Sequence, residues 1–297
     1  MTASSAPHAR VHYRTVKIDG LDIFYREAGP TTDDAPTLLL LHGFPTSSHM
    51  FRDLMPLLGD QFRLIAPDYP GFGYSSTPSP SEFEYTFDHL AEVAARFTDA
   101  LGLNSYSLYL QDFGGPVGFR LAALHPHRVE RLIIQNANAY LEGVTPVLRD
   151  VVLRVWTERT PETEARIREL FEPSTTYRQF TEGAEDPTLV SPDSWQHAQW
   201  GMDRPGNKEI QFALHVNYGS NVERYDEWHE YFRVYQPATL VVWGERDFVF
   251  ARAGAEAYRK DLQDVEVHLL KAGHFALETN AVEIAAHIRR FMARPAR

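Results

Sequence analysis

Short apolar runs recur along the chain, and each ends at a polar residue or a glycine. Between them lie longer segments whose apolar residues recur every three or four positions. The short apolar runs are typical of strands buried on both faces. The longer periodic segments are typical of amphipathic helices. The predicted strands are Thr37–Leu41, Phe62–Ala66, Ser105–Leu110, Val129–Gln135, Ala238–Trp243 and Val265–Leu270. The predicted helices are Met50–Leu58, Thr86–Leu101, Gly115–His125, Ala253–Leu262 and Ala281–Ala293. This alternation predicts an α/β protein with a mostly parallel central sheet flanked by helices.

The amino-terminal part of the chain departs from the alternation. Residues 1–11 are expected to form a flexible tail. The segments Val16–Ile18 and Leu21–Tyr25 flank the dipeptide Asp19-Gly20, which is typical of a tight turn between strands. Together they predict an antiparallel hairpin at the start of the fold.

The alternation also stops between residues 139 and 234. This stretch holds four of the five tryptophans and several turn signals that contain proline or glycine. It predicts a mainly helical cap inserted after the sixth strand. The cap divides the core into residues 12–138 and 235–297, and it explains the length of 297 residues without a second independent core.

Composition narrows the range of functions. The chain contains no cysteine, which excludes disulfides, a cysteine nucleophile, cysteine-ligated zinc and iron–sulfur clusters. The net charge of −11 makes nucleic acid a poor partner. No apolar stretch approaches the roughly 20 residues of a membrane span, and the start of the chain lacks a secretory signal. A cytoplasmic protein with no membrane partner is therefore expected.

Cofactor motifs give no positive signal. The histidines and acidic residues show no metal spacing such as His-Glu-x-x-His, and no phosphate-binding glycine loop stands in the required context. We expect neither a cofactor nor a metal, and the expected partners are a small uncharged organic substrate and water. Both a monomer and a homodimer remain open.

The segment Leu108–Gly118 carries the main chemical signal. A predicted strand ends there, Asp112 follows at a sharp turn, and Gly114 and Gly115 stand where a helix begins. This order is typical of a nucleophile elbow, usually written Gly-x-Ser-x-Gly. The helix start is expected to lower the pKa of the Asp112 carboxyl and keep it ionised. Taken alone, Asp112 is also explained as a helix N-cap.

Two further residues favour the nucleophile. Asp247 follows the strand Ala238–Trp243, and His274 follows the next predicted strand. The carboxyl ends of parallel strands meet at one edge of a sheet. The chain order of nucleophile, acid and histidine is that of the α/β-hydrolases. Asp112, Asp247 and His274 are therefore the predicted catalytic residues.

Two loops extend the pattern. The loop His42–Ser48 follows the first long parallel strand and resembles the one that supplies an oxyanion-hole N–H in that family. The donors would be the backbone N–H groups of Phe44 and Phe113. The segment Asp68–Ser75 resembles the family's Asp-x-x-Gly-x-Gly-x-Ser loop and is expected to have a structural role.

With these motifs the chain resembles an α/β-hydrolase of the epoxide hydrolase and haloalkane dehalogenase branch, from about Val11 to Phe291. The resemblance implies a hydrolase in which the ionised Asp112 attacks an sp³ carbon and forms an ester. His274, oriented by Asp247, would then activate the water that hydrolyses this ester.

An epoxide and a haloalkane differ in the group that leaves the attacked carbon, and each leaving group needs a different hydrogen-bond donor. An opening epoxide needs an O–H donor, and in epoxide hydrolases cap tyrosines supply it. The resemblance points to Tyr218, with Tyr140 and Tyr177 as weaker candidates. A departing halide needs N–H donors, which the side chains of Phe44 and Phe113 lack, whereas Trp156 could supply one. For each of these aromatic residues, core packing is the alternative role.

We therefore expect an epoxide hydrolase-like activity that yields a diol. The alternatives are a haloalkane or haloacid dehalogenase-like hydrolase that releases halide, and a hydrolase acting on another carbon electrophile or an ester. An alternative from another class of protein is a non-catalytic small-molecule binder with the same fold. The presence of Asp112, Asp247 and His274 together argues against it, because a binder does not need all three.

Overall fold

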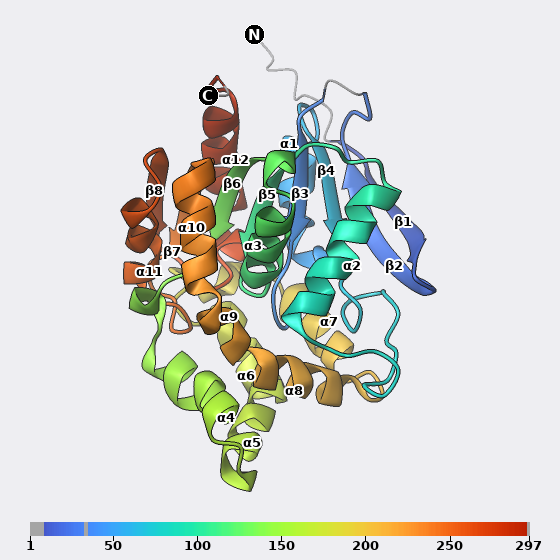
Figure 1. The fold of residues 1–297 in the computed structure, drawn as a ribbon, viewed down its shortest axis with the longest axis vertical. Helices are drawn as coiled ribbons and strands as arrows, with labels where there is room; N and C mark the ends of the chain where they lie inside the picture. The colour runs from blue at the N-terminus through green and yellow to red at the C-terminus, as the bar shows by residue number, and fades with distance from the viewer. Residues whose placement is uncertain (1–8, 33–34, 296–297) are drawn as a thin grey trace.

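The computed structural model describes residues 9–32 and 35–295. Its centre is an eight-stranded sheet with the order β1-β2-β4-β3-β5-β6-β7-β8 (Figure 1). The strands are β1 Val11–Ile18, β2 Leu21–Ala28, β3 Thr37–Leu41, β4 Arg63–Pro67, β5 Tyr106–Gln111, β6 Val129–Gln135, β7 Ala238–Gly244 and β8 Val265–Leu270. The pairs β1–β2 and β2–β4 are antiparallel, and the remaining pairs are parallel. The predicted fold class and the predicted hairpin are confirmed.

Helices cover both faces of the sheet, which explains the continuous apolar runs. In β3, Leu39 and Leu41 face one core cluster, whereas Leu38 and Leu40 face the other. The first cluster includes residues of α2, α3 and α10, and the second includes residues of α1 and α12. The helices are α1 Leu54–Leu58, α2 Phe87–Ala100, α3 Gly114–Leu124, α4 Arg154–Thr157, α5 Pro161–Arg168, α6 Pro173–Thr181, α7 Pro192–Met202, α8 Asn207–Asn217, α9 Gly219–Glu223, α10 Tyr225–Tyr235, α11 Arg252–Ala257 and α12 Leu277–Met292.

Several predicted boundaries need correction. Of the predicted tail, residues 1–8 lie outside the described residues, and β1 already begins at Val11, which pairs with Ala28. The predicted helix Met50–Leu58 is a 3-10 turn, Ser48–Phe51, followed by α1. The last helix begins at Leu277, earlier than predicted, and contains a non-helical residue, Asn280.

The segment between β6 and β7 is helical and includes a π-helical turn, Leu148–Leu153. Its helices α4 to α9 lie below the sheet in Figure 1, at the end away from both chain termini. The last helix of the segment, α10, instead packs beside α3. The predicted cap of residues 139–234 therefore includes a helix that belongs spatially to the layer covering the sheet.

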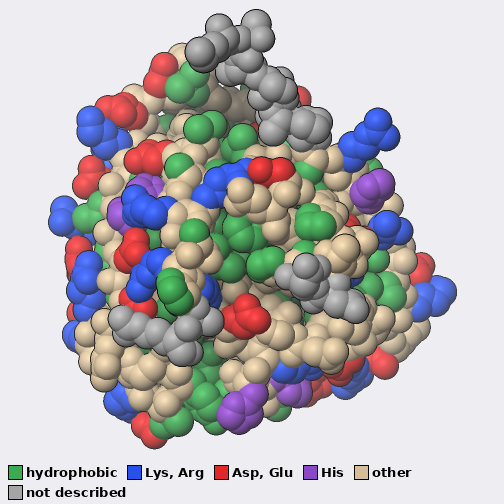
Figure 2. All heavy atoms as spheres, turned by 90° about the horizontal axis from the view of Figure 1, so that it is seen from above, with side chains coloured by type: hydrophobic (Ala, Val, Ile, Leu, Met, Phe, Trp, Pro, Cys, Tyr) green, Lys and Arg blue, Asp and Glu red, His purple; other side chains and the backbone are tan. Residues whose placement is uncertain are grey.

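The end of the molecule that holds both chain termini, opposite the inserted helices, carries both acidic and basic side chains (Figure 1 and Figure 2). Figure 2 shows acidic and basic side chains interspersed around its rim, with apolar side chains nearer the centre. The net charge of −11 is thus not gathered into one acidic field on this face. Among residues 9–32 and 35–295, no helix is both long enough and apolar enough to cross a membrane.

Candidate active site

The turn after β5 holds Asp112 in a backbone conformation that few residues adopt. Its φ angle is +48°, in the left-handed region, where strain of about 1–3 kcal/mol is typical for a residue with a side chain. The turn requires a small residue nearby, because a Cβ on Gly114 would lie 2.1 Å from the carbonyl oxygen of Leu41. The predicted elbow geometry is present, with Asp112 at its tip.

The Asp112 carboxylate is buried and held by the loop that follows β3. Its Oδ1 accepts a hydrogen bond from the Phe44 N–H at 2.7 Å, and the Phe113 N–H is near enough to lower the pKa of the carboxyl. The loop comes this close because residue 43 is glycine: a Cβ there would lie 2.3 Å from the Asp112 Cβ. The α3 helix has Phe113 at its N-cap and no side-chain cap, so Asp112 is not a simple helix cap.

Burial shifts the pKa of the Asp112 carboxyl in the direction opposite to the one expected from the sequence. It raises the pKa of the Asp112 carboxyl above its ordinary value, although His274 and the N–H groups of Phe44 and Phe113 oppose the rise. The prediction that the helix start lowers this pKa is therefore wrong, because the loss of hydration outweighs the nearby donors.

His274 lies between the two carboxylates. Its Nδ1 is 2.9 Å from Asp247 Oδ2, so Nδ1 carries the proton and donates it to the carboxylate. Its Nε2 lies 3.7 Å from Asp112 Oδ2 and 3.2 Å from the amide nitrogen of Gln111. An amide nitrogen donates, so Nε2 carries the lone pair. This tautomer has its basic nitrogen on the side of Asp112.

Asp247 is fixed in turn by two donors. Asn136 Nδ2 donates to its Oδ2 at 2.8 Å, and the Val249 N–H donates to its Oδ1 at 2.7 Å. Asn136 also bridges to the end of β7, where its Oδ1 accepts from the Gly244 N–H. The acid is therefore oriented by Asn136 from the neighbouring strand end and by Val249 from its own loop, which limits the rotation of both Asp247 and His274.

A cavity of about 90 Å³ lies between the strand ends and the inserted helices. Asp112 and His274 line it from the sheet side. Its other walls are mainly apolar and come from Phe44, Phe113, Val147, Leu148, Val152, Leu170, Phe248, Val249 and Phe250. Its remaining polar lining residues are Thr175, Arg178, Gln179, His215 and Tyr218. The carboxylate and the imidazole thus face a small, largely apolar space.

Comparison with known proteins agrees with this geometry. The family described as alpha/beta hydrolase fold matches residues 36–281. The chain belongs to this family, and it is a hydrolase. A hydrolase of Saccharomyces cerevisiae, described as uncharacterized, is 39% identical over 283 residues, which cover 94% of this chain and 96% of that protein.

Two further similarities are to a haloalkane dehalogenase and an epoxide hydrolase. Haloalkane dehalogenase 2 of Mycobacterium bovis is 44% identical over 101 residues, covering 34% of this chain and 35% of that protein. An epoxide hydrolase solved without ligand superposes with a TM-score of 0.77 at 21% identity, covering 96% of this chain and 99% of that one. The dehalogenase similarity is confined to about a third of each chain, and the superposition with the epoxide hydrolase shows a shared fold.

Tyr218 is the predicted leaving-group residue that the hydrolase brings to the cavity. It is buried at the junction of α8 and α9, and its ring packs 5.8 Å from that of Phe113. Its hydroxyl has no hydrogen-bond partner in the part of the chain that the structure describes. Burial, Tyr225 and the nearby Asp112 raise the pKa of Tyr218, which keeps the hydroxyl protonated.

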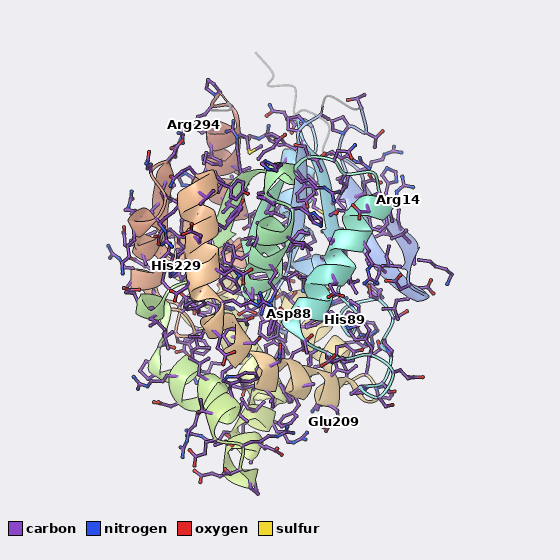
Figure 3. The ribbon with its side chains drawn as sticks, viewed as in Figure 1. Arg14, Asp88, His89, Glu209, His229 and Arg294 are labelled. Atoms are coloured by element: carbon purple, nitrogen blue, oxygen red, sulfur yellow. The ribbon has the colours of Figure 1, made fainter. Side chains whose placement is uncertain are left out.

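The residues on either side of Tyr218 are tied to the core. Asn217 accepts a hydrogen bond from the Phe87 N–H at 2.9 Å, and Asn221 accepts one from Arg120 at 2.7 Å. Arg120 also pairs with Asp88, which Figure 3 labels where α2 meets the inserted helices. These contacts hold the backbone that carries the Tyr218 ring in place.

The other three predicted leaving-group residues lie elsewhere, so this prediction needs correction. The indole N–H of Trp156 donates to Glu223 at 3.0 Å, and the side chain is 39% exposed. The Tyr140 hydroxyl donates to Asp261, and its ring stacks on His229. Tyr177 is half-exposed and packs edge-on against Trp195. Each has a partner away from the cavity, as the packing alternative implies.

Sequence reasoning missed the roles of four residues. Asn136 donates a hydrogen bond to Asp247, and Gln111 contacts His274. His215 and Gln179 line the cavity. The amide of Gln179 is buried and has no hydrogen-bond partner among residues 9–32 and 35–295. A signal existed for His215, because it precedes Tyr218 by one helical turn and residues so spaced share a helix face.

Proposed function

We propose that this hydrolase opens epoxides to vicinal diols through an ester on Asp112. The observation that carries the proposal is the Tyr218 hydroxyl, which is unpaired among the described residues and lines the same cavity as Asp112. An opening epoxide generates an alkoxide, and a phenolic O–H is a suitable donor to it. Asp112 is close enough to Tyr218 to contribute to its raised pKa, so both groups act on one small substrate.

The first half-reaction forms the ester. An oxygen of the Asp112 carboxylate attacks one epoxide carbon, the carbon–oxygen bond of the ring breaks, and the released oxygen takes the proton of Tyr218. The carboxylate is already an anion when it attacks, so this step requires no general base.

The second half-reaction hydrolyses the ester. His274 Nε2 takes a proton from a water molecule, whose oxygen attacks the carbonyl carbon of the Asp112 ester. The N–H groups of Phe44 and Phe113 stabilise the developing oxyanion; the loss of one such donor in a protease costs about 3–4 kcal/mol. The ester bond then breaks, the alkoxide takes the proton from His274 and leaves as the diol, and Asp112 releases the second proton of the water to solvent and is again a carboxylate. Tyr218 regains its proton from solvent.

A haloalkane dehalogenase-like activity is the second candidate. It shares every step except the departure of the leaving group, and the unpaired amide of Gln179 supports it as one N–H donor to a halide. No tryptophan lines the cavity among the described residues, so none of them can donate an indole N–H to a halide there. A haloacid is less well supported, because the guanidinium of Arg178 already pairs with Glu182.

The two functions separate in one assay. Purified protein is incubated with 1,2-epoxybutane, styrene oxide and 1-bromobutane, and diol and bromide are quantified, with Asp112→Ala as the inactive control. Diol from an epoxide supports the proposal. Bromide without diol would overturn it in favour of the second candidate.

Removal of the Tyr218 hydroxyl should slow ring opening. For Tyr218→Phe we expect kcat for epoxides to fall by about 10²-fold, within the range for loss of a positioned proton donor. Tyr140→Phe is the matched control, because its hydroxyl is engaged outside the cavity, and it should stay within about twofold of wild type. Single-turnover kinetics of ester formation provide the measurement. Equal rates for both variants would contradict the role of Tyr218.

The pH dependence should follow His274, which must be neutral to accept a proton from water. Burial alone would lower its pKa, but Asp247 and Asp112 raise it above the ordinary value of 6.5. Asp112 is an uncharged ester when His274 accepts this proton, so Asp247 is the carboxylate that still raises the pKa. We expect kcat to decline with falling pH by up to about tenfold per pH unit below the pKa of His274. In Asp247→Asn this limb should move to lower pH. An acid limb at the same pH in Asp247→Asn and wild type would contradict this role.

A further inference from the structure

His215 is a polar group in the cavity that the proposed mechanism does not use. It is buried on α8, and its ring packs against those of Phe44, Phe113 and Phe171 at centroid distances of 4.5, 5.3 and 5.3 Å. Glu209, six residues earlier on the same helix, instead pairs with Arg168 at the surface (Figure 3). The helix thus presents His215 to the interior.

The hydrogen bonds of His215 define its tautomer. Nδ1 lies 2.7 Å from the carbonyl oxygen of Gln211, one turn earlier on α8. A carbonyl oxygen only accepts, so Nδ1 carries the hydrogen. Burial lowers the pKa of His215 to about 4, so the ring is neutral near pH 7. Nε2 is therefore a lone-pair acceptor, and it has no partner among the residues that the structure describes.

The position of this acceptor restricts what it can bind. Two of the rings packed against His215, those of Phe44 and Phe113, belong to residues whose backbone N–H groups lie beside the Asp112 carboxylate. His215 and Asp112 also line the same cavity of about 90 Å³, so a substrate group that reaches His215 is expected within a few bonds of the carbon that Asp112 attacks. A buried acceptor that stays unpaired costs free energy, so a site of this kind discriminates against ligands that lack a donor.

We propose that His215 Nε2 selects epoxides carrying a hydrogen-bond donor, a hydroxyl or an amide N–H, on a carbon adjacent to the ring or one bond further away. This inference rests on the proposed epoxide-opening function and names its substrate class. His215 acts here as a specificity-determining residue and exchanges no proton with the reacting atoms. A bare halide lacks a donor and would gain nothing from this acceptor.

A matched pair of substrates tests the proposal. The substrates 2,3-epoxypropan-1-ol and 1,2-epoxybutane differ only by a hydroxyl in place of a methyl group. The readout is the ratio of their kcat/KM values, compared between wild type and variants so that the intrinsic reactivity difference of the two epoxides cancels. In His215→Phe we expect the preference for the alcohol to fall by about tenfold, with 1,2-epoxybutane still converted. His215→Gln retains an acceptor oxygen and should keep part of the preference.

Two controls make the outcome decisive. His229→Phe replaces a histidine that contacts the carbonyl of Ala139 outside the cavity, and it should leave the ratio unchanged. The ¹⁵N shifts of His215 at pH 7 should show a protonated Nδ1 and a bare Nε2, a measurement that requires no substrate.

The failures are distinguishable. Diol from both epoxides with an unchanged ratio in His215→Phe, or a hydrogen on Nε2, overturns the inference and leaves the proposed function standing. Absence of diol from every epoxide overturns the proposed function, and the substrate class with it.

Discussion

Substitution of His274 by glutamine should stop the reaction after its first half and leave the protein alkylated on Asp112. The attack of the carboxylate requires no base, whereas hydrolysis of the ester depends on the Nε2 lone pair that faces Asp112. Turnover should fall by at least about 10³-fold, in line with the loss of a general base from a coupled catalytic set. The intact mass should rise by one whole epoxide molecule, because ring opening expels no atoms.

The adduct also identifies the substrate class. A haloalkane loses its halide on attack, so it adds only the alkyl group in place of a proton. Peptide mapping should place either adduct on Asp112. The matched control is His268→Gln, a half-exposed histidine in β8, which should turn over normally and stay unmodified. Unmodified His274→Gln protein that still consumes substrate at the wild-type rate would refute the ester mechanism.

Removal of Arg52 should cause the largest loss of stability among the substitutions considered. Arg52 binds Glu278 through two hydrogen bonds, at 2.6 and 3.2 Å, and the Glu278 side chain is only 1% exposed. The pair ties the loop after β3 to the start of α12. Arg52→Met leaves the carboxylate buried without its cation, which typically costs about 3–5 kcal/mol. Denaturant unfolding at pH 8 measures this change.

The pH response provides an internal check. Burial already raises the pKa of Glu278 even though Arg52 opposes the rise, so loss of Arg52 should raise it further. The variant gains stability by binding a proton, and its deficit should shrink as the pH falls from 8 to 5. Arg154→Met removes an exposed i,i+4 partner of Glu158 and should cost below about 1 kcal/mol. Equal losses in the two variants would show that the buried pair contributes no more than the exposed one.

Much of the site followed from one property of parallel sheets. Asp112, Asp247 and His274 each come within four residues of the end of an apolar run, and the carboxyl ends of parallel strands meet at one edge. Their positions in the chain were therefore enough to predict that they lie together, and the structure brings them together. The role of Asn136 was not predictable in this way, because it depends on β6 pairing with β7.

The aromatic residues of the inserted helices show where sequence reasoning ended. Trp156, Tyr140 and Tyr218 all have the chemistry of a leaving-group donor, yet only Tyr218 lines the cavity. Successive side chains of an α-helix point in directions about 100° apart. A small error in the predicted start or orientation of a helix therefore changes which side chain is expected to face inward. Local sequence could not decide between the cavity and a surface partner such as Glu223.

The sequence by itself determined the α/β architecture, the elbow at Asp112 and the order of acid and histidine, because apolar periodicity and strand-end chemistry are local properties. The tertiary structure alone decided how the catalytic groups are tuned and what they face. Burial raises the pKa of Asp112, and packing directs Tyr218, Gln179 and His215 into one cavity. These properties arise from contacts between segments far apart in the chain, where hydration is lost and polar groups must find partners across the fold.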